Sequence, residues 1–147
     1  NELFIGPRSH GSALYELRHG AAAESQSSSG LIVATGLGST AWLRSIVTGS
    51  MAIAQSLGAA APARGYEPLP WDEPALVFAV REPFPTRHTQ ASLVFGRVSG
   101  EQPLRVQSRM PEGGVIFSDG MEADQLPFGA GLVARIAPSA RRGQLVV

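Results

Sequence analysis

The chain has 147 residues, of which 12 are basic and 12 acidic, so its formal net charge is zero. This length is enough for one domain with a hydrophobic core, and the balanced charge gives no indication of nucleic-acid binding. Cysteine is absent, which excludes disulfides, thiol chemistry and thiolate metal sites. All 12 basic residues are arginine, which excludes a Walker lysine and Schiff-base catalysis. No apolar run is long enough to span a membrane and no signal peptide is evident, so we expect a cytoplasmic protein.

The first 29 residues predict strands and a polar loop. Residues 1–6 predict a strand, with Phe4 on the face opposite its apolar neighbours. Residues 12–17 fit either a strand or a helical turn, because their apolar residues alternate over a short distance. Residues 20–29 are small and polar and include four serines, which predicts a loop.

Residues 30–42 are the most informative stretch of the chain. The apolar run at residues 31–34, bounded by glycines, predicts a short buried strand. Two glycines in the turn at residues 35–38 permit backbone conformations that other residues resist. Ser39 or Thr40 is then placed to cap the helix that follows.

A strand, a glycine turn and a helix start bring free backbone N–H groups and small hydroxyls to one point. Such a corner suits a nucleotide or a phosphate. Many corners of this kind bind nothing, so the local pattern alone favours a structural turn over a ligand site.

A helix is predicted from Thr40 onward, because apolar residues recur with helical spacing at positions 42, 43, 46 and 47. Residues 48–50 weaken the pattern, which resumes over residues 51–57 and ends at Gly58. The sequence therefore allows one helix or two, with an apolar stripe that is typical of packing against a core.

Two residues at the start of this helix are candidate ligand contacts. Trp42 lies one residue inside the helix, next to the proposed corner, where its ring could lie against a nucleotide. Ser45 follows one turn after Ala41 or Trp42, so it could face the same ligand.

The remainder of the chain predicts a proline-rich loop followed by short strands. Residues 59–74 contain four prolines and predict a connecting loop. Strands separated by turn residues are predicted at residues 76–80, 91–98, 104–108, 114–117, 132–136 and 145–147. The fold class is therefore mainly β (α+β), a β-sandwich-like single domain over residues 1–147 with one or two helices after the glycine-rich turn.

Two further residues, Asp119 and His10, have side chains that could take part in chemistry. Asp119 lies in a Ser-Asp-Gly hairpin signal in which Gly120 adopts a positive φ. It could be a catalytic carboxylate, but turn chemistry explains it better. His10 has no nearby acidic residue or cysteine to suggest a ligand set, so no metal site is predicted.

Several motifs occur in a fixed order along the chain. They are Asn1-Glu2, Ser29 to Thr35, Gly38-Ser39-Thr40-Ala41-Trp42, Phe117-Ser118-Asp119-Gly120-Met121, Phe128-Gly129 and Leu132 to Ile136. In this order they resemble the C-terminal, NAD-binding domain of the NAD kinases. The Thr-Gly-x-Gly-Ser-x-Ala-Trp form is similar to the mitochondrial-type and divergent bacterial branch. The matching motifs are spread over most of the chain, and the first 45 residues match the family pattern most closely.

The resemblance implies a set of NAD-binding residues. The family uses its Asn-Glu pair to hold NAD, and a tyrosine at the position of Trp42 contacts NAD. The implied contacts in this chain are Asn1, Glu2, Thr35, Gly38, Ser39, Thr40, Ala41, Trp42 and Ser45. The Asp-Gly hairpin is mainly structural in the family, which supports the same reading of Asp119.

The resemblance also implies a reaction, in which the 2′-hydroxyl of the adenosine ribose of NAD is phosphorylated to give NADP. ATP or another donor and Mg²⁺ would take part. The family carries out phosphoryl transfer with a Gly-Gly-Asp-Gly-Thr motif in an N-terminal α/β domain, and this motif does not occur in the chain. We therefore expect a fragment of a bacterial cytoplasmic enzyme, inactive alone and without catalytic residues. Its expected partners are NAD, the N-terminal domain and further copies in a homo-oligomer, with no nucleic acid or membrane.

The sequence departs from the family pattern at three places. Ser29 replaces the usual aspartate and adds no charge, so a contact to NAD there would be weaker or rearranged. Gly36-Leu37 replaces a Pro-Thr pair, and residues 48–50 replace a Gly-Gly-Pro element. Two alternatives therefore stay open: a non-catalytic nucleotide-binding or oligomerisation domain that kept the fold, and a related kinase acting on a sugar or lipid.

Overall fold

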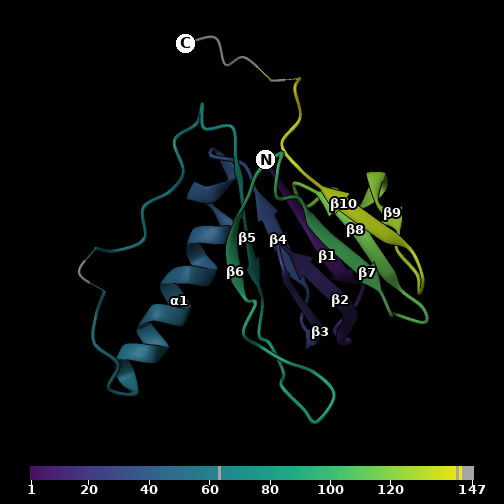
Figure 1. Cartoon of the computed structure of the whole chain (residues 1–147), viewed down its shortest axis with the longest axis horizontal. Helices are drawn as coiled ribbons and strands as arrows, with labels where there is room; N and C mark the ends of the chain where they lie inside the picture. Colours follow the sequence, from purple (N-terminus) through teal and green to yellow (C-terminus); the bar gives the residue numbers. More distant parts are fainter. Residues whose placement is uncertain (63, 142, 144–147) are drawn as a thin grey trace.

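The computed structural model describes residues 1–62, 64–141 and 143 (Figure 1). Its elements, in chain order, are β1 (Glu2–Pro7), β2 (Ala13–His19), β3 (Ala22–Ser28), β4 (Leu31–Ala34), the 3-10 turn η1 (Gly38–Thr40), α1 (Trp42–Ser56), β5 (Leu76–Val80), β6 (Phe95–Val98), β7 (Leu104–Ser108), β8 (Gly114–Ser118), η2 (Glu122–Asp124), β9 (Leu126–Pro127) and β10 (Val133–Ile136). The strands form a six-stranded sheet of order β6-β5-β4-β1-β8-β9 and a four-stranded sheet of order β10-β7-β2-β3. Every pairing within these two sheets is antiparallel.

The two sheets pack face to face around one hydrophobic core. Ile5 and Phe78 from the six-stranded sheet and Leu17 and Val106 from the four-stranded sheet are fully buried in this core. Phe4 points to the opposite face of the six-stranded sheet, where it joins a separate cluster. This alternation along β1 follows the predicted pattern. The mainly β, sandwich-like fold predicted from the sequence is confirmed.

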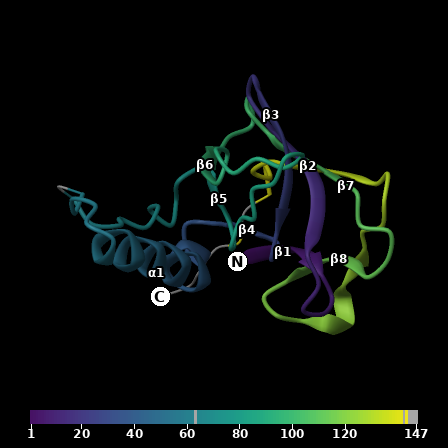
Figure 2. The same ribbon diagram turned by 90° about the horizontal axis from the view of Figure 1, so that it is seen from below.

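Helix α1 covers the other face of the six-stranded sheet, so this sheet is covered by a layer on each face. Leu43 is fully buried there against Ala34, Val77 and Ala79. The helix lies on the side of the molecule away from β2 and β7 (Figures 1 and 2). The outer face of the four-stranded sheet carries no helix among the described residues. No helix in this part of the chain is both long enough and apolar enough to cross a membrane.

Most predicted strands are present, with small changes in their ends. The alternating residues 12–17 belong to a strand, β2, and not to a helical turn. The strand predicted at residues 91–98 is shorter, because only Phe95–Val98 pairs with β5. The strand predicted at residues 145–147 lies outside the described residues.

The loop predicted at residues 20–29 is wrong, because most of this segment is strand β3. Gly20, with φ of 58°, turns the chain tightly, and β3 then pairs with β2 along its whole length. Buried polar groups of the hairpin form hydrogen bonds: the Tyr15 and Ser28 hydroxyls bond at 2.8 Å, and the Gln26 amide donates to the Leu93 carbonyl at 3.0 Å, although the Gln26 Oε1 atom has no partner among the described residues. Complete pairing and these hydrogen bonds outweigh the weak strand preference of alanine and serine.

The helix is single and continuous through residues 48–50, where the sequence pattern weakens. An interior glycine costs a helix about 1 kcal/mol relative to alanine, which does not end the helix here. Residues 59–74 then return alongside α1 to β5 without regular structure in the described part (Figures 1 and 2). The loop predicted for this stretch is thus observed.

Candidate functional site

The pairing of β1 with β4 brings two distant motifs of the sequence together. Glu2 is the register partner of Ala34, so the start of β1 lies beside the end of β4. The Thr35 N–H donates to the Asn1 carbonyl at 2.9 Å. The Asn-Glu pair and the Thr35-to-Trp42 segment therefore form one corner, which we call the Asn-Glu corner.

The glycines of this corner are required by close contacts and not by a positive φ. A Cβ atom on Gly38 would lie 2.7 Å from a Glu2 carboxylate oxygen and closer still to the Asn1 carbonyl oxygen. One on Gly36 would lie 2.9 Å from the Trp71 Cα atom and closer to the Pro70 carbonyl. Neither glycine has a positive φ, so the conformational reason predicted from the sequence is wrong. Small residues are needed here because other backbone segments pass directly over them.

The N-terminus of helix α1 is capped by a residue of β1, and not by a residue of the turn that precedes the helix. Neither Ser39 nor Thr40 caps it: both lie in the preceding η1 turn, and the residue at the cap position, Ala41, makes no side-chain cap hydrogen bond. The Trp42 N–H donates instead to the Glu2 carboxylate at 3.3 Å. A carboxylate at a helix N-terminus is favourably placed in the field of the helix dipole. The cap predicted from the sequence is therefore wrong, because β1 brings a stronger acceptor to the same place.

Ser39 is fully buried and holds the corner to the following loop. Its hydroxyl donates to the Gly36 carbonyl at 2.6 Å and accepts from the Leu69 N–H at 3.0 Å. The Tyr66 hydroxyl donates to the Ser39 carbonyl at 3.0 Å. Burial raises the pKa of Tyr66, although its hydrogen bond to Ser39 opposes the shift. The phenol therefore stays protonated at neutral pH and keeps this bond.

Three other hydroxyls, two in the corner and one beside it on α1, are exposed. Thr40 donates to the Leu37 carbonyl at 2.8 Å, and Ser45 makes a longer bond of 3.4 Å to the Ala41 carbonyl. The Thr35 hydroxyl accepts the Gly38 N–H at 3.2 Å. Because each hydroxyl oxygen carries two lone pairs, each of these groups can still accept a hydrogen bond from a ligand.

The Trp42 ring is half-buried in an aromatic cluster. It stacks on Phe4 with ring centroids 5.8 Å apart and planes 5° apart. The Arg81 guanidinium carbon lies 5.2 Å from the Trp42 ring centroid, a cation–π arrangement. Arg81 was not identified from the sequence, because it follows β5 and reaches the corner only through the order of strands in the sheet.

Asp119 supports the Asn-Glu pair from the turn that follows the neighbouring strand, β8. Its carboxylate accepts from the Asn1 nitrogen at 2.8 and 2.9 Å and from the Glu2 N–H at 3.1 Å. The predicted turn is confirmed, since Asp119 and Gly120 have φ of 50° and 73°. The support it gives to Asn1 and Glu2 had no signal in the sequence, because it depends on the pairing of β1 with β8.

An open hollow of about 690 Å³ adjoins the Asn-Glu corner. Asn1, Thr35 and Leu37 line one side of it, and Trp71, which is 63% exposed, lines another. A hollow of this size is in the range of small-molecule sites. Within residues 1–62, 64–141 and 143, no group of three or more His, Asp or Glu side chains could hold a metal ion.

Comparison with known proteins gives similarity at the level of structure. No protein-family model and no curated protein sequence matches the chain. The structure is similar to that of an NAD kinase from Archaeoglobus fulgidus in complex with ATP, with a TM-score of 0.58 and 20% identity over 95% of this chain. It is also similar to yeast NADH kinase complexed with NADH, with a TM-score of 0.55 and 17% identity over 94% of this chain.

The chain spans less than half the length of either enzyme, covering 45% of the Archaeoglobus chain and 34% of the yeast chain. Almost all of its own length takes part in both superpositions. The resemblance first found in the Asn-Glu pair and the Thr35-to-Trp42 segment is thus matched by the arrangement of the whole domain. The chain has the fold of part of the NAD and NADH kinases.

Proposed function

We propose that the chain is the NAD-binding C-terminal domain of a NAD kinase, and that the Asn-Glu corner holds the adenosine part of NAD. One observation carries this proposal. The pairing of β1 with β4 sets Asn1 and Glu2 against the Thr35-to-Trp42 segment, in a fold shared with an NAD kinase and an NADH kinase. Two motifs that are 33 positions apart in the sequence, from Glu2 to Thr35, meet at one point, as a shared binding site requires.

The polar groups of the corner suit the hydroxyls of a ribose. The Glu2 carboxylate accepts one long hydrogen bond from Trp42 and keeps further lone pairs for ribose hydroxyls. The exposed oxygens of Thr35, Thr40 and Ser45 can accept further hydrogen bonds. The proposed contacts are Asn1, Glu2, Thr35, Gly38, Ser39, Thr40, Ala41, Trp42 and Ser45. Ser39 would act through its backbone, since its hydroxyl already bonds within the protein.

Phosphoryl transfer needs groups that the described residues do not supply. No described cluster of acidic side chains fits Mg²⁺, so we assign no step of the reaction to a metal in this domain. We propose that an α/β domain outside this chain binds the phosphate donor and Mg²⁺. The 147 residues alone are then expected to form no NADP from NAD and ATP, and NADP formation by the purified chain would overturn this assignment.

We further propose that the protein is a homo-oligomer. Helix α1 leaves large apolar side chains exposed near its end: Ile53 is 64% and Leu57 is 83% exposed. Exposed apolar surface of this kind marks sites of protein association. Sedimentation at tens of micromolar is expected to show a species larger than the monomer, and a monomer alone would argue against the proposal.

The proposed NAD site is tested by calorimetric titration of the purified protein with NAD, NADH, ATP and glucose. NAD or NADH is expected to bind, whereas a related sugar kinase would bind glucose instead. Glu2→Gln removes the charge but keeps the shape, and loss of a charged hydrogen bond costs about 1.5–3 kcal/mol. We expect NAD affinity to fall about tenfold or more.

The matched control is Glu112→Gln, because Glu112 is exposed in the turn at the other end of β8. It should leave NAD affinity unchanged. If Glu2→Gln binds NAD as tightly as the unaltered protein, the Asn-Glu pair is not part of the site.

A further inference from the structure

Three arginines lie side by side across the outer face of the four-stranded sheet. Arg18 of β2 is the register partner of Arg105 of β7, and Arg105 is the register partner of Arg135 of β10. Residues directly opposite one another project from the same face of a sheet. All three side chains are exposed, whereas the adjacent Leu104 and Val106 are buried in the core. Because neighbouring strands are about 4.8 Å apart, the row is roughly 10 Å long.

The positive charge of this arginine row is only partly compensated. Glu16 is the carboxylate that pairs with it: Arg18 bonds to one of its oxygens, and Arg109 bonds to the other at 2.9 Å. These bonds, led by that of Arg18, lower the pKa of Glu16, which is therefore ionised at neutral pH. Arg105 and Arg135 make no side-chain hydrogen bond or ion pair among the described residues. Like charges directly opposite one another destabilise a sheet, so the row costs stability as it stands.

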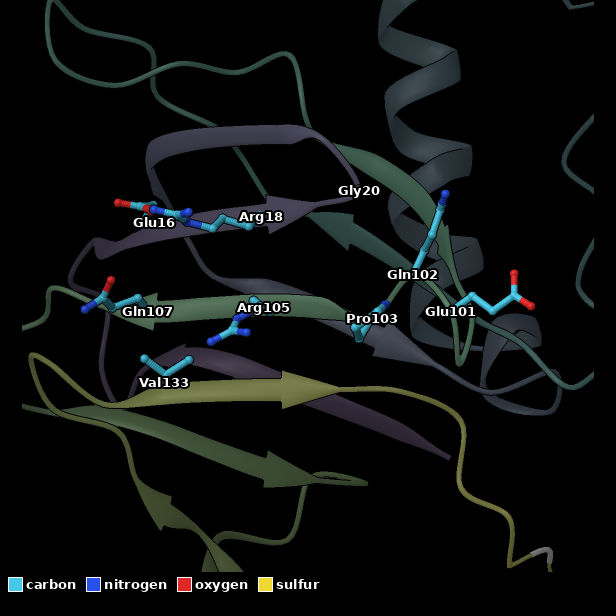
Figure 3. Close-up of a pocket in the computed structure, with 9 residues that line it drawn as sticks. All are labelled: Glu16, Arg18, Gly20, Glu101, Gln102, Pro103, Arg105, Gln107 and Val133. Carbon is cyan, nitrogen blue, oxygen red and sulfur yellow. Dashed lines mark hydrogen bonds and ion pairs between the residues drawn. The ribbon is translucent and has the colours of Figure 1, made fainter.

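An open hollow of about 600 Å³ lies over two members of the row, Arg18 and Arg105. Arg18, Arg105 and Gln107 line it, and the turn at residues 101–103 forms one side (Figure 3). The Arg105 head lies between β7 and β10 in this view, and the Gln107 amide lies further along β7. The Arg105 guanidinium thus faces a hollow whose other charged lining groups are Arg18, already paired with Glu16, and Glu101.

We propose that the arginine row binds a diphosphate group, either free pyrophosphate or the diphosphate of a nucleotide. Guanidinium groups bind phosphate oxygens through paired N–H donors. Two linked phosphates can bridge adjacent members of the row, whereas a single phosphate contacts fewer of them. The bridging anion neutralises Arg105 and Arg135 and removes the repulsion across the strands.

A short anion fits this surface better than an extended one. Glu101 and Glu16 also line the hollow, and Glu16 already pairs with Arg18, so an anion is left the short end of the row at Arg105 and Arg135, which is too short for a long polyanion such as a nucleic acid. The chain as a whole has no net charge to attract such a polymer. The row is also separate from the Asn-Glu corner, because it lies on the face of the sandwich away from α1 (Figure 2). The proposal therefore does not depend on the proposed NAD site.

The first test is calorimetric titration of the protein with pyrophosphate, ADP, AMP and inorganic phosphate in 50 mM and 300 mM NaCl. Pyrophosphate is expected to bind at least tenfold more tightly than phosphate, and more weakly at the higher salt concentration. Arg105→Gln should weaken pyrophosphate binding at least tenfold. Arg87→Gln, in an exposed loop elsewhere, should not change it. If ADP binds and Arg105→Gln abolishes this binding, the ligand of the row is the diphosphate of a nucleotide. If pyrophosphate binds and ADP does not, the ligand is the free anion.

The second test measures thermal unfolding of the same proteins. Because Arg105→Gln removes the central charge of the row, it should raise the melting temperature in low salt without an anion. Arg105→Gln should also abolish the increase in melting temperature that pyrophosphate causes in the unaltered protein. The proposal is overturned if Arg105→Gln binds pyrophosphate like the unaltered protein. It is equally overturned if a single-stranded oligonucleotide binds and pyrophosphate does not.

Discussion

The Asn-Glu corner and the arginine row differ in how their polar groups are satisfied. In the corner, Glu2, Ser39 and Thr40 each have a hydrogen-bond partner in the protein, and Gly38 leaves no room for a side chain. In the row, Arg105 and Arg135 have no such partner among the described residues. The corner therefore presents a fixed set of groups, as a selective site requires, whereas the row attracts a ligand mainly by charge. Substitutions at the buried residues of the corner should cost stability, and loss of a charge in the row should increase it.

The largest effect is expected for Gly38→Val, which would break the corner. The added side chain would overlap the Asn1 carbonyl and the Glu2 carboxylate, so β1 or the η1 turn must move. Overpacking of this kind costs about 3 kcal/mol, which urea denaturation would measure. The control is Gly49→Ala inside α1, where no atom lies within 4 Å of the new Cβ. It should raise stability by about 0.5–1 kcal/mol, and equal losses in both variants would contradict the role given to Gly38.

A smaller loss is expected for Trp42→Ala. It removes the stacking on Phe4 and the surface beneath Arg81. For a half-buried ring we expect a loss of about 2 kcal/mol in unfolding free energy. Trp42→Tyr keeps an aromatic ring and should cost less than half as much. If Trp42→Tyr is as unstable as Trp42→Ala, the stacked arrangement does not stabilise the corner.

Ser39→Ala is expected to cost about 1–2 kcal/mol, because it leaves the Leu69 N–H without its buried acceptor. Ser45→Ala removes the same group, a serine hydroxyl, from an exposed position where it makes one long hydrogen bond. The unfolding free energy of this variant should therefore change by less than about 0.5 kcal/mol. Thermal unfolding of the two variants under identical conditions compares them. Equal melting temperatures would show that the buried bonds of Ser39 contribute nothing.

The strands with alternating or continuous apolar residues could be predicted from the sequence, because their hydrophobic side chains must face a core. Strand β3 could not, since alanine and serine carry little strand preference and its stability comes from pairing with β2 and from the Tyr15–Ser28 bond. The sequence also left open whether the helix continues through Gly49, which it does. A weak local preference does not by itself end a helix or exclude a strand, because tertiary packing can outweigh it.

The residues of the corner were recognised from motifs, but their contacts were not. Glu2 caps α1 across 40 residues of sequence, and Asp119 reaches Glu2 across 117 residues. Such contacts follow from the order of strands in the sheet, which local patterns do not contain. The need for glycine at positions 36 and 38 was predicted, but its cause was wrong, because close approach of another segment leaves no trace in the local sequence.

The central claim, that the Asn-Glu corner holds NAD, is tested most directly by calorimetry of Thr40→Val with NAD. Thr40 is exposed and its hydroxyl bonds only to the adjacent Leu37 carbonyl among the described residues, so the variant should keep the melting temperature within a few degrees. Loss of one hydrogen bond to the ligand should weaken NAD binding by about 1 kcal/mol, or roughly fivefold. A Thr40→Val protein with unchanged stability and unchanged NAD affinity would contradict the account and leave the corner as a structural turn.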